Sequence, residues 1–184
     1  TYLISRLTRD HVTVSLSGDG GDELFYGYSR YFFAQRVWNK IRWIPAEIRS
    51  LLSAIFSNPL LPKITKLQLI SETLALRTQD DFYHRIVSAW KNPVEVVKGA
   101  IEPLTALTGS QREIQLNEFP LRMMFFDLIS YLPDDILVKV DRASMGVSLE
   151  ARVPLIDHRI VEFSWRLPLS LKYRNGKGKW ILRQ

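Results

Sequence analysis

The chain has 184 residues, 46% of them hydrophobic and 24% charged, and this composition excludes an intrinsically disordered protein. Its apolar runs are far shorter than the roughly 20 residues that span a bilayer, and the absence of cysteine excludes disulfides, thiolate metal sites and a cysteine nucleophile. The net charge of +6 would attract polyanions, but most of these charges are expected on solvated helix faces, so nucleic acid is the weaker hypothesis for a partner. We expect a cytoplasmic protein that does not contact a membrane.

The first elements of the chain are predicted to be a helix, a strand and a glycine-rich loop. Residues 2–7 have the pattern of an amphipathic helix without a start signal, and we interpret the chain as a fragment of a longer protein. The run HVTVSLS, residues 11–17, alternates apolar and polar side chains, as a short strand does. The glycines of GDGGDE, residues 18–23, then exclude regular structure until about Asp22, where a helix that continues to Phe32 is expected to begin.

Nearly everything that follows is predicted to be helical. Expected helices cover residues 45–56, 63–76, 111–131, 134–146 and 157–166, with a further one that begins at about residue 79. The helix over 111–131 is apolar around most of its circumference, which indicates that it is buried. Because proline suits the first turn of a helix, Pro133 is expected to separate this helix from the next one.

The glycine-rich loop is the first candidate for a functional site. Glycine lets another group approach the backbone closely, and ligands of open α/β sheets bind at the carboxyl ends of the strands. Asp19 and Asp22 could hold Mg²⁺ there, since Mg²⁺ takes one or two carboxylates together with water and phosphate. They could equally shape a turn and cap a helix, and from the residues alone both interpretations stay open. The spacing matches neither a Walker A loop nor a dinucleotide fingerprint.

A second charged segment lies between residues 132 and 163. In its sequence, LPDDILVKVDRASMGVSLEARVPLIDHRIVEF, acidic and basic side chains alternate on an apolar background. Partly buried charges are tolerated when they are paired, so a structural network of ion pairs is the simpler interpretation of these residues. His158 has no second histidine at metal-ligand spacing, and we do not expect it to bind a metal.

Three segments of the sequence, taken together, indicate a protein family more specifically than either of the two candidate sites does alone. They are LSGDGGDELFYGY (16–28), LPDDILVKVDRASMGVSLEARVPLIDHRIVEFSWRLP (132–168) and GKGKWILRQ (176–184). This set resembles the synthetase domain of glutamine-hydrolysing asparagine synthetases. The resemblance runs from about residue 2 to residue 184, so the whole chain would be part of the C-terminal, amide-forming domain. It is weak over residues 36–110, which we interpret as a helical insertion particular to a subgroup.

The resemblance implies a doubly wound α/β fold of the adenine-nucleotide hydrolase type. Within it, the present chain would be predominantly α-helical with one short strand, and the remaining parallel strands would lie upstream. The implied chemistry is activation of the aspartate side-chain carboxylate by ATP, with Mg²⁺, to give β-aspartyl-AMP and pyrophosphate. Ammonia, released from glutamine by a glutaminase domain of the same parent chain, would then attack.

The resemblance also assigns roles to five residues. Ser17 and Gly18 match the pair whose backbone lies against ATP, and Asp22 matches the acid that holds Mg²⁺. Asp19 occupies the place of a glutamate that is thought to assist formation or breakdown of the acyl-adenylate. Asp135 is a candidate for a partner carboxylate that faces the reacting centre. Because aspartate is one methylene shorter than glutamate, this difference at Asp19 implies either a different carboxylate as the acceptor of the adenylyl group or a shifted geometry of the site.

Several motifs of this family are missing from the sequence and are expected upstream or downstream of it. The pyrophosphate loop Ser-Gly-Gly-x-Asp-Ser, the catalytic cysteine of the glutaminase and a phosphate-binding lysine in Arg-x-Lys-x-Gly-Phe are all absent. We therefore expect the isolated chain to be inactive, and its exposed apolar surface to favour self-association into a homo-oligomer. Two other interpretations stay open: a related amidotransferase or β-lactam synthetase-like enzyme that adenylates another carboxylate, and a helical module that binds nucleic acid.

Overall fold

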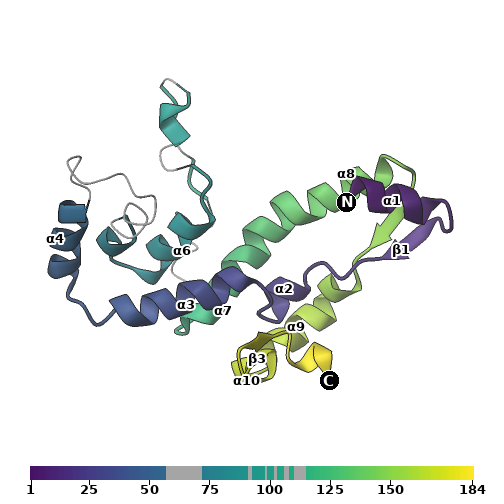
Figure 1. The fold of residues 1–184 in the computed structure, drawn as a ribbon. Helices are drawn as coiled ribbons and strands as arrows, with labels where there is room; N and C mark the ends of the chain where they lie inside the picture. Colours follow the sequence, from purple (N-terminus) through teal and green to yellow (C-terminus); the bar gives the residue numbers. More distant parts are fainter. Residues whose placement is uncertain (57–71, 91–92, 98, 102, 106–107, 110–114) are drawn as a thin grey trace. The chain divides into compact units, whose positions relative to one another are not determined.

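The computed structural model describes residues 1–184 except 57–71, 91–92, 98, 102, 106–107 and 110–114 (Figure 1). The chain divides into two compact units, of which the first contains residues 1–28 and 120–184 and the second contains residues 29–119. The second unit encloses the predicted insertion, residues 36–110, and extends beyond it at both ends. In the described part of the chain, no helix has both the length and the apolarity needed to cross a membrane.

The described residues form mainly helices, as the sequence predicts, and these are accompanied by a few short strands. The α-helices include α1 (Tyr2–Arg9), α2 (Gly21–Leu24), α3 (Ser29–Ile41), α4 (Ala46–Phe56), α6 (Gln79–Val87), α7 (Phe119–Phe126), α8 (Val138–Met145), α9 (His158–Arg166) and α10 (Leu169–Lys172), and residues 72–75 are helical as well. The strands are β1 (Val14–Leu16), β2 (Glu150–Arg152), β3 (Tyr173–Arg174) and β4 (Lys177–Gly178). Single-turn 3-10 helices are η1 (Pro93–Glu95), η4 (Pro154–Ile156) and η5 (Ile181–Arg183), and η3 (Asp127–Leu137) is a π-helix.

The prediction of a single strand is wrong, because β1 has a partner. β2 lies beside it as a parallel neighbour (Figure 1), with Ser15 opposite Ala151 in the register. The pairing continues at both ends, where the Glu150 N–H donates to the Thr13 carbonyl at 2.9 Å and the Ser17 N–H donates to the Arg152 carbonyl at 2.8 Å. The sequence of β2 is Glu-Ala-Arg, which has little intrinsic strand propensity, so this strand depends on its neighbour.

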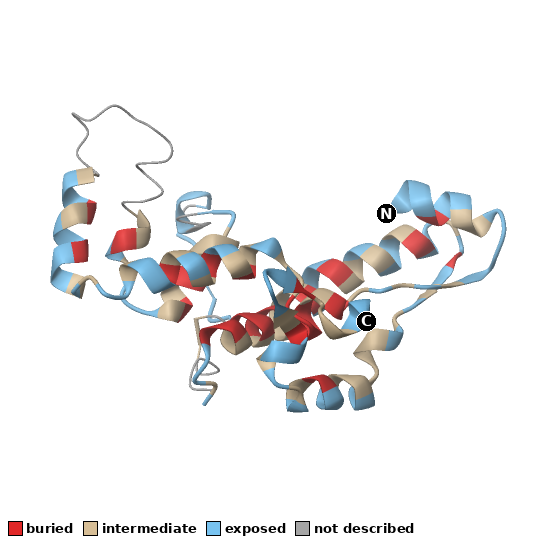
Figure 2. Cartoon of the chain, turned by 60° about the horizontal axis from the view of Figure 1, so that its bottom comes forward, coloured by how far each residue is buried: buried red, intermediate tan, exposed pale blue. Residues whose placement is uncertain are grey.

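The predicted helix break at Pro133 is also wrong. Residues 119–145 form one uninterrupted helical run in which α7 passes into η3 and η3 into α8, with Pro133 inside the π-helical part. A proline within a helix removes one N–H and crowds the preceding turn, and the wider turns of a π-helix accommodate the ring. Buried residues recur along both α7 and η3, which confirms the prediction of a core helix here, and Figure 2 shows buried segments in red. Residues 111–114, where the helix was expected to begin, lie outside the described residues.

The predicted helix that starts at Asp22 is split. α2 ends at Leu24, because Tyr26 has a φ of 57° in the left-handed region, and α3 starts separately at Ser29. The predicted helices over 45–56 and 157–166 and the one beginning near residue 79 are confirmed as α4, α9 and α6. Most of the predicted helix over 63–76 falls outside the described residues.

The segment after α10 forms a β-hairpin that the sequence analysis missed. β3 and β4 are antiparallel, and Asn175 and Gly176 join them with φ values of 52° and 76°. Two residues of positive φ form the type I′ turn that suits a two-residue hairpin, and Asn-Gly is its commonest sequence. The ring of Tyr173 lies 5.4 Å from that of the buried Tyr26, so the hairpin packs on the segment that follows α2.

The second unit has its own aromatic core. Trp38 of α3, Phe82 of α6 and Phe119 lie with their ring centres 5.6 to 6.4 Å apart. Arg49 of α4 is buried over the Trp38 ring and donates from Nη1 to the Leu76 carbonyl at 2.9 Å. These contacts give the second unit a packed interior of its own.

Lys172 is buried in the first unit without a counter-charge. Its Nζ lies 5.0 Å from the centre of the Trp165 ring and has no hydrogen-bond partner among the described residues. Burial lowers the pKa of Lys172 to about 8, whereas its ordinary value is 10.5. Between these two values the unfolded chain binds more protons than the folded chain, so the contribution of Lys172 to the free energy of unfolding increases with pH across this window.

Replacing Lys172 by methionine is expected to stabilise the chain by roughly 1–3 kcal/mol at pH 7. The change removes the cost of burying a charge and keeps a side chain of similar length against Trp165. Urea unfolding of both proteins at pH 7 and pH 10 measures the effect. The difference should shrink at pH 10, where Lys172 is already neutral in the folded chain; a destabilised variant at pH 7 would contradict this account.

Candidate functional site

The loop between β1 and α2 is held by backbone contacts at both ends. At its start, the Ser17 N–H extends the parallel ladder of β1 and β2. The Ser17 hydroxyl then donates a hydrogen bond to Asp19 Oδ2, and the Gly21 N–H donates to the Gly18 carbonyl at 3.3 Å. The loop therefore places Ser17, Gly18 and Asp19 at the carboxyl end of β1, as the sequence predicts.

Two glycines of this loop, Gly20 and Gly18, have different surroundings. Gly20 has a φ of 83° at the N-terminus of α2, and an added Cβ would lie 2.7 Å from Ile156 Cγ2. Only glycine combines this backbone conformation with so little space. At Gly18, by contrast, an added Cβ would have no atom within 4 Å, so the backbone there is open to a ligand.

A cavity of about 470 Å³ lies beside Ser17 and Asp19. Its lining comes from β1, β2, α1 and α8, and α8 contributes Lys139 and Ser144. The Lys139 side chain and the Asp19 carboxylate both line this cavity. An acid, an ammonium group and hydroxyls around one cavity can bind a charged, polar molecule through complementary hydrogen bonds.

Asp22 lies in the first turn of α2 and is not part of that lining. Its Oδ1 forms an ion pair with the Nζ of Lys179 at 2.9 Å, and both side chains are about two-thirds buried, with 34% and 29% exposed. The pair passes over Gly27, where an added Cβ would lie 1.9 Å from Asp22 Oδ1 and 2.4 Å from Lys179 Cε. The sequence analysis missed this partner of Asp22, because nothing in the local spacing connects a loop near residue 22 to a hairpin near residue 178.

Asp135 lies on η3 with an exposed side chain and is likewise outside the lining of the cavity. The helix η3 packs against α2, which carries Asp22. The structure thus brings Ser17 and Asp19 together, gives Asp22 a separate partner and leaves Asp135 on a neighbouring surface.

Glu23 is a buried carboxyl group that the sequence analysis did not single out. Its Oε1 accepts a hydrogen bond from the Tyr28 hydroxyl at 2.7 Å, and its Oε2 is buried without a partner among the described residues. Burial raises the pKa of Glu23, and the nearby charges of Asp22 and Asp127 raise it further, while the bond from Tyr28 opposes them. Since α2 is only one turn long, no periodicity in the sequence indicated that this side chain points inward.

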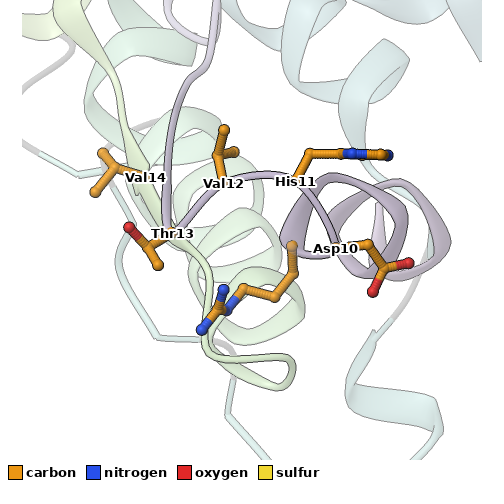
Figure 3. Close-up of a pocket in the computed structure, with 6 residues that line it drawn as sticks. Asp10, His11, Val12, Thr13 and Val14 are labelled. Carbon is orange, nitrogen blue, oxygen red and sulfur yellow. The ribbon is translucent and has the colours of Figure 1, made fainter.

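A second hollow lies at the opposite end of β1. Figure 3 shows the loop between α1 and β1, whose residues 9–14 line about 490 Å³ of open space. Asp10 and His11 are the labelled titratable side chains there, and both are exposed. Ligands of open α/β sheets bind beyond the carboxyl ends of the strands, so the cavity beside Ser17 and Asp19 is the stronger candidate.

The residues of this region offer a carboxylate to Mg²⁺ and an open stretch of backbone to ATP. Among the described residues, no group of three histidine or carboxylate side chains could enclose a metal ion. Mg²⁺ does not need such a cage, because it takes one or two carboxylates and completes its shell with phosphate and water, and Asp22 could supply one carboxylate. The open backbone at Gly18 gives a nucleotide room to approach.

Comparison with known proteins adds an independent observation. The family model described as asparagine synthase matches residues 1–184. Over 191 aligned positions the chain is 28% identical to asparagine synthetase (glutamine-hydrolyzing) 1 of Bacillus subtilis (strain 168). This alignment covers 100% of the chain and 29% of the relative. Asparagine synthetase (glutamine-hydrolyzing) 3 of the same strain is 31% identical over 185 positions, covering 100% of this chain and 25% of the relative. The chain thus spans less than a third of these relatives, and no solved structure matches it.

Proposed function

The chain belongs to the asparagine synthase family, and from that premise we propose that the protein containing it forms an amide from a carboxylate, ATP and ammonia. The proposed carboxylate is the side chain of aspartate, activated as β-aspartyl-AMP with release of pyrophosphate. The ammonia would come from glutamine, hydrolysed by a glutaminase domain of the same polypeptide. We expect this enzyme to work in the cytoplasm.

One observation carries the proposal. Ser17 and Asp19 are hydrogen-bonded to each other at the carboxyl end of β1, beside a cavity that also receives Lys139. This is the end of a parallel strand where ligands bind, and the family match extends over the whole chain. An accessible backbone next to an acid and a lysine suits a reaction in which charge develops on a carboxylate and a phosphate.

Each predicted residue then has a role in the proposal. The backbone of Ser17 and Gly18 would lie against ATP, and Asp19 would stabilise charge at the reacting carboxylate or hold a proton there. Asp22 would hold Mg²⁺, which lowers the cost of negative charge on the phosphates. Asp135 is proposed as a further carboxylate near the reacting centre, supported by the packing of η3 on α2.

A second candidate function is adenylation of a different carboxylate, in a related amidotransferase or a β-lactam synthetase-like enzyme. The observation that favours it is Asp19, whose short side chain lines the cavity and accepts a hydrogen bond from the Ser17 hydroxyl. A shorter acid leaves more room in the cavity, so a bulkier carboxylate would be accommodated.

Carboxylate-dependent exchange of pyrophosphate into ATP tests the two candidates. The experiment uses the intact protein, meaning the polypeptide with any residues outside 1–184, and a panel of carboxylates that includes aspartate. Exchange with aspartate supports asparagine formation, whereas exchange only with another acid supports the second candidate. The 184-residue chain alone is expected to be inactive in this assay, and exchange by that chain would contradict this expectation.

A further inference from the structure

Lys179 is a charged side chain to which the proposed function gives no role. Its Nζ lies 2.9 Å from Asp22 Oδ1, the carboxylate that we propose as the ligand of Mg²⁺. The two residues are far apart in the sequence and meet through the fold of the C-terminal hairpin. An ammonium group in this place occupies the position from which a cation would approach that oxygen.

The backbone of Lys179 is fixed by its own contacts. It follows β4, has a φ of 54° and donates its N–H to the Phe25 carbonyl at 2.8 Å, just after the end of α2. The next residue, Trp180, donates its N–H to the Lys172 carbonyl at 2.9 Å. Because the hairpin is attached to the segment after α2 in this way, Lys179 is delivered to Asp22 by ordered backbone rather than by a free surface chain.

The side chain of Lys179 also has a path that only glycine leaves open. An added Cβ at Gly27 would lie 2.4 Å from Lys179 Cε, and one at Gly21 would lie 3.7 Å from Lys179 Nζ. The Lys179 stem therefore crosses the surface of Gly27 on its way to Asp22. With less than a third of the lysine side chain exposed, this is a packed ion pair and not a chance surface contact.

We propose that the Lys179 ammonium is the resident counter-ion of Asp22, which a divalent cation has to displace when it binds this carboxylate. This inference rests on the proposed function in one respect, namely that Asp22 binds a cation. The ion pair would keep the loop ordered and electrically balanced before Mg²⁺ and ATP arrive. Lys179 would then be a positioning residue that sets the cation concentration at which the site fills.

The sign of the effect follows from electrostatics. Two positive charges near one carboxylate oxygen repel each other, so removing the ammonium makes cation binding tighter. Exposed ion pairs have small energies and the present pair is partly buried, so the expected gain is on the order of three- to tenfold in affinity. A merely structural lysine would change stability and leave this affinity unaltered or reduced.

The test measures the affinity of the intact protein for Mn²⁺ in the absence of nucleotide. Electron paramagnetic resonance monitors the binding. Lys179→Met is expected to bind Mn²⁺ about three to ten times more tightly than the parent, and Lys179→Arg, which keeps the charge, to resemble the parent. Lys177→Met is the matched control, since Lys177 is exposed on the same hairpin and its loss should have no effect. The gain should vanish when Asp22→Asn is added to Lys179→Met.

Three results would overturn the inference: unchanged or weaker binding by Lys179→Met, a gain that survives Asp22→Asn, or a parent protein without Asp22-dependent binding. Circular dichroism melting establishes that the variants are folded, and Lys179→Gln replaces the methionine variant if that one does not fold. The proposed function fails separately, if no carboxylate supports pyrophosphate exchange while the Mn²⁺ comparison still gives the expected gain.

Discussion

Gly27→Ala is expected to lower the free energy of unfolding of the chain by roughly 2–3 kcal/mol. The new methyl carbon would lie 1.9 Å from Asp22 Oδ1, 2.4 Å from Lys179 Cε and 2.8 Å from Asp22 Cγ. Since these distances are far below contact, the ion pair has to separate and both side chains have to move. The Gly27 N–H also donates to the Asp22 carbonyl at 2.9 Å, which holds the backbone of Gly27 close to Asp22. Urea unfolding followed by fluorescence measures the loss.

Gly18→Ala is the matched control for Gly27→Ala. It adds the same methyl group in the loop that precedes α2, with no atom within 4 Å of the new carbon, whereas Gly27 lies after α2. The free energy of unfolding of Gly18→Ala should therefore stay within about 0.5 kcal/mol of the parent. If Gly27→Ala were as stable as Gly18→Ala, the packed arrangement of Asp22, Gly27 and Lys179 would be wrong.

Asp22→Asn is expected to reduce the Mg²⁺-dependent pyrophosphate exchange of the intact protein by about 100-fold or more. Asparagine keeps the shape of the side chain and removes the charge that would hold the metal ion beside the phosphates. Folding should change little, because an ion pair with about a third of each side chain exposed contributes at most about 1 kcal/mol. Initial rates over a range of Mg²⁺ concentrations, together with melting temperatures, separate the two effects.

Asp10→Asn provides the comparison for Asp22→Asn. Asp10 is exposed at the opposite end of β1, so its loss should leave both exchange and melting temperature unaltered. Equal losses of activity in the two variants would indicate a general effect of charge. A large drop in melting temperature for Asp22→Asn without a specific loss of exchange would make Asp22 a structural residue.

The parts of the fold that sequence analysis predicted are those in which local pattern and final structure agree. β1 alternates apolar and polar residues, and α9 begins at His158, directly after the N-cap residue Asp157, whose side chain accepts a hydrogen bond from the Arg159 N–H. The same local reasoning placed Ser17, Gly18 and Asp19 at the end of a strand. In each case the determining interactions lie within a few residues of one another.

The errors occur where distant residues or unusual backbone decide the structure. β2 forms because β1 lies beside it, and Pro133 remains inside a helix because η3 has π-helical turns. The hairpin after α10 had a readable signal, the dipeptide Asn175-Gly176, which the sequence analysis did not use. The pairing of Asp22 with Lys179 had no local signal, because it depends on where that hairpin packs.

The most direct test of the central claim, that this family member activates a carboxylate by adenylation, is isotope transfer. The intact protein is incubated with ATP, Mg²⁺, glutamine and aspartate labelled with ¹⁸O in its side-chain carboxylate, and the nucleotide product is analysed by mass spectrometry. If an acyl-adenylate forms and ammonia displaces AMP, one ¹⁸O atom leaves with AMP and the account is supported. Amide formation with unlabelled AMP, or with ADP as the product, would contradict it.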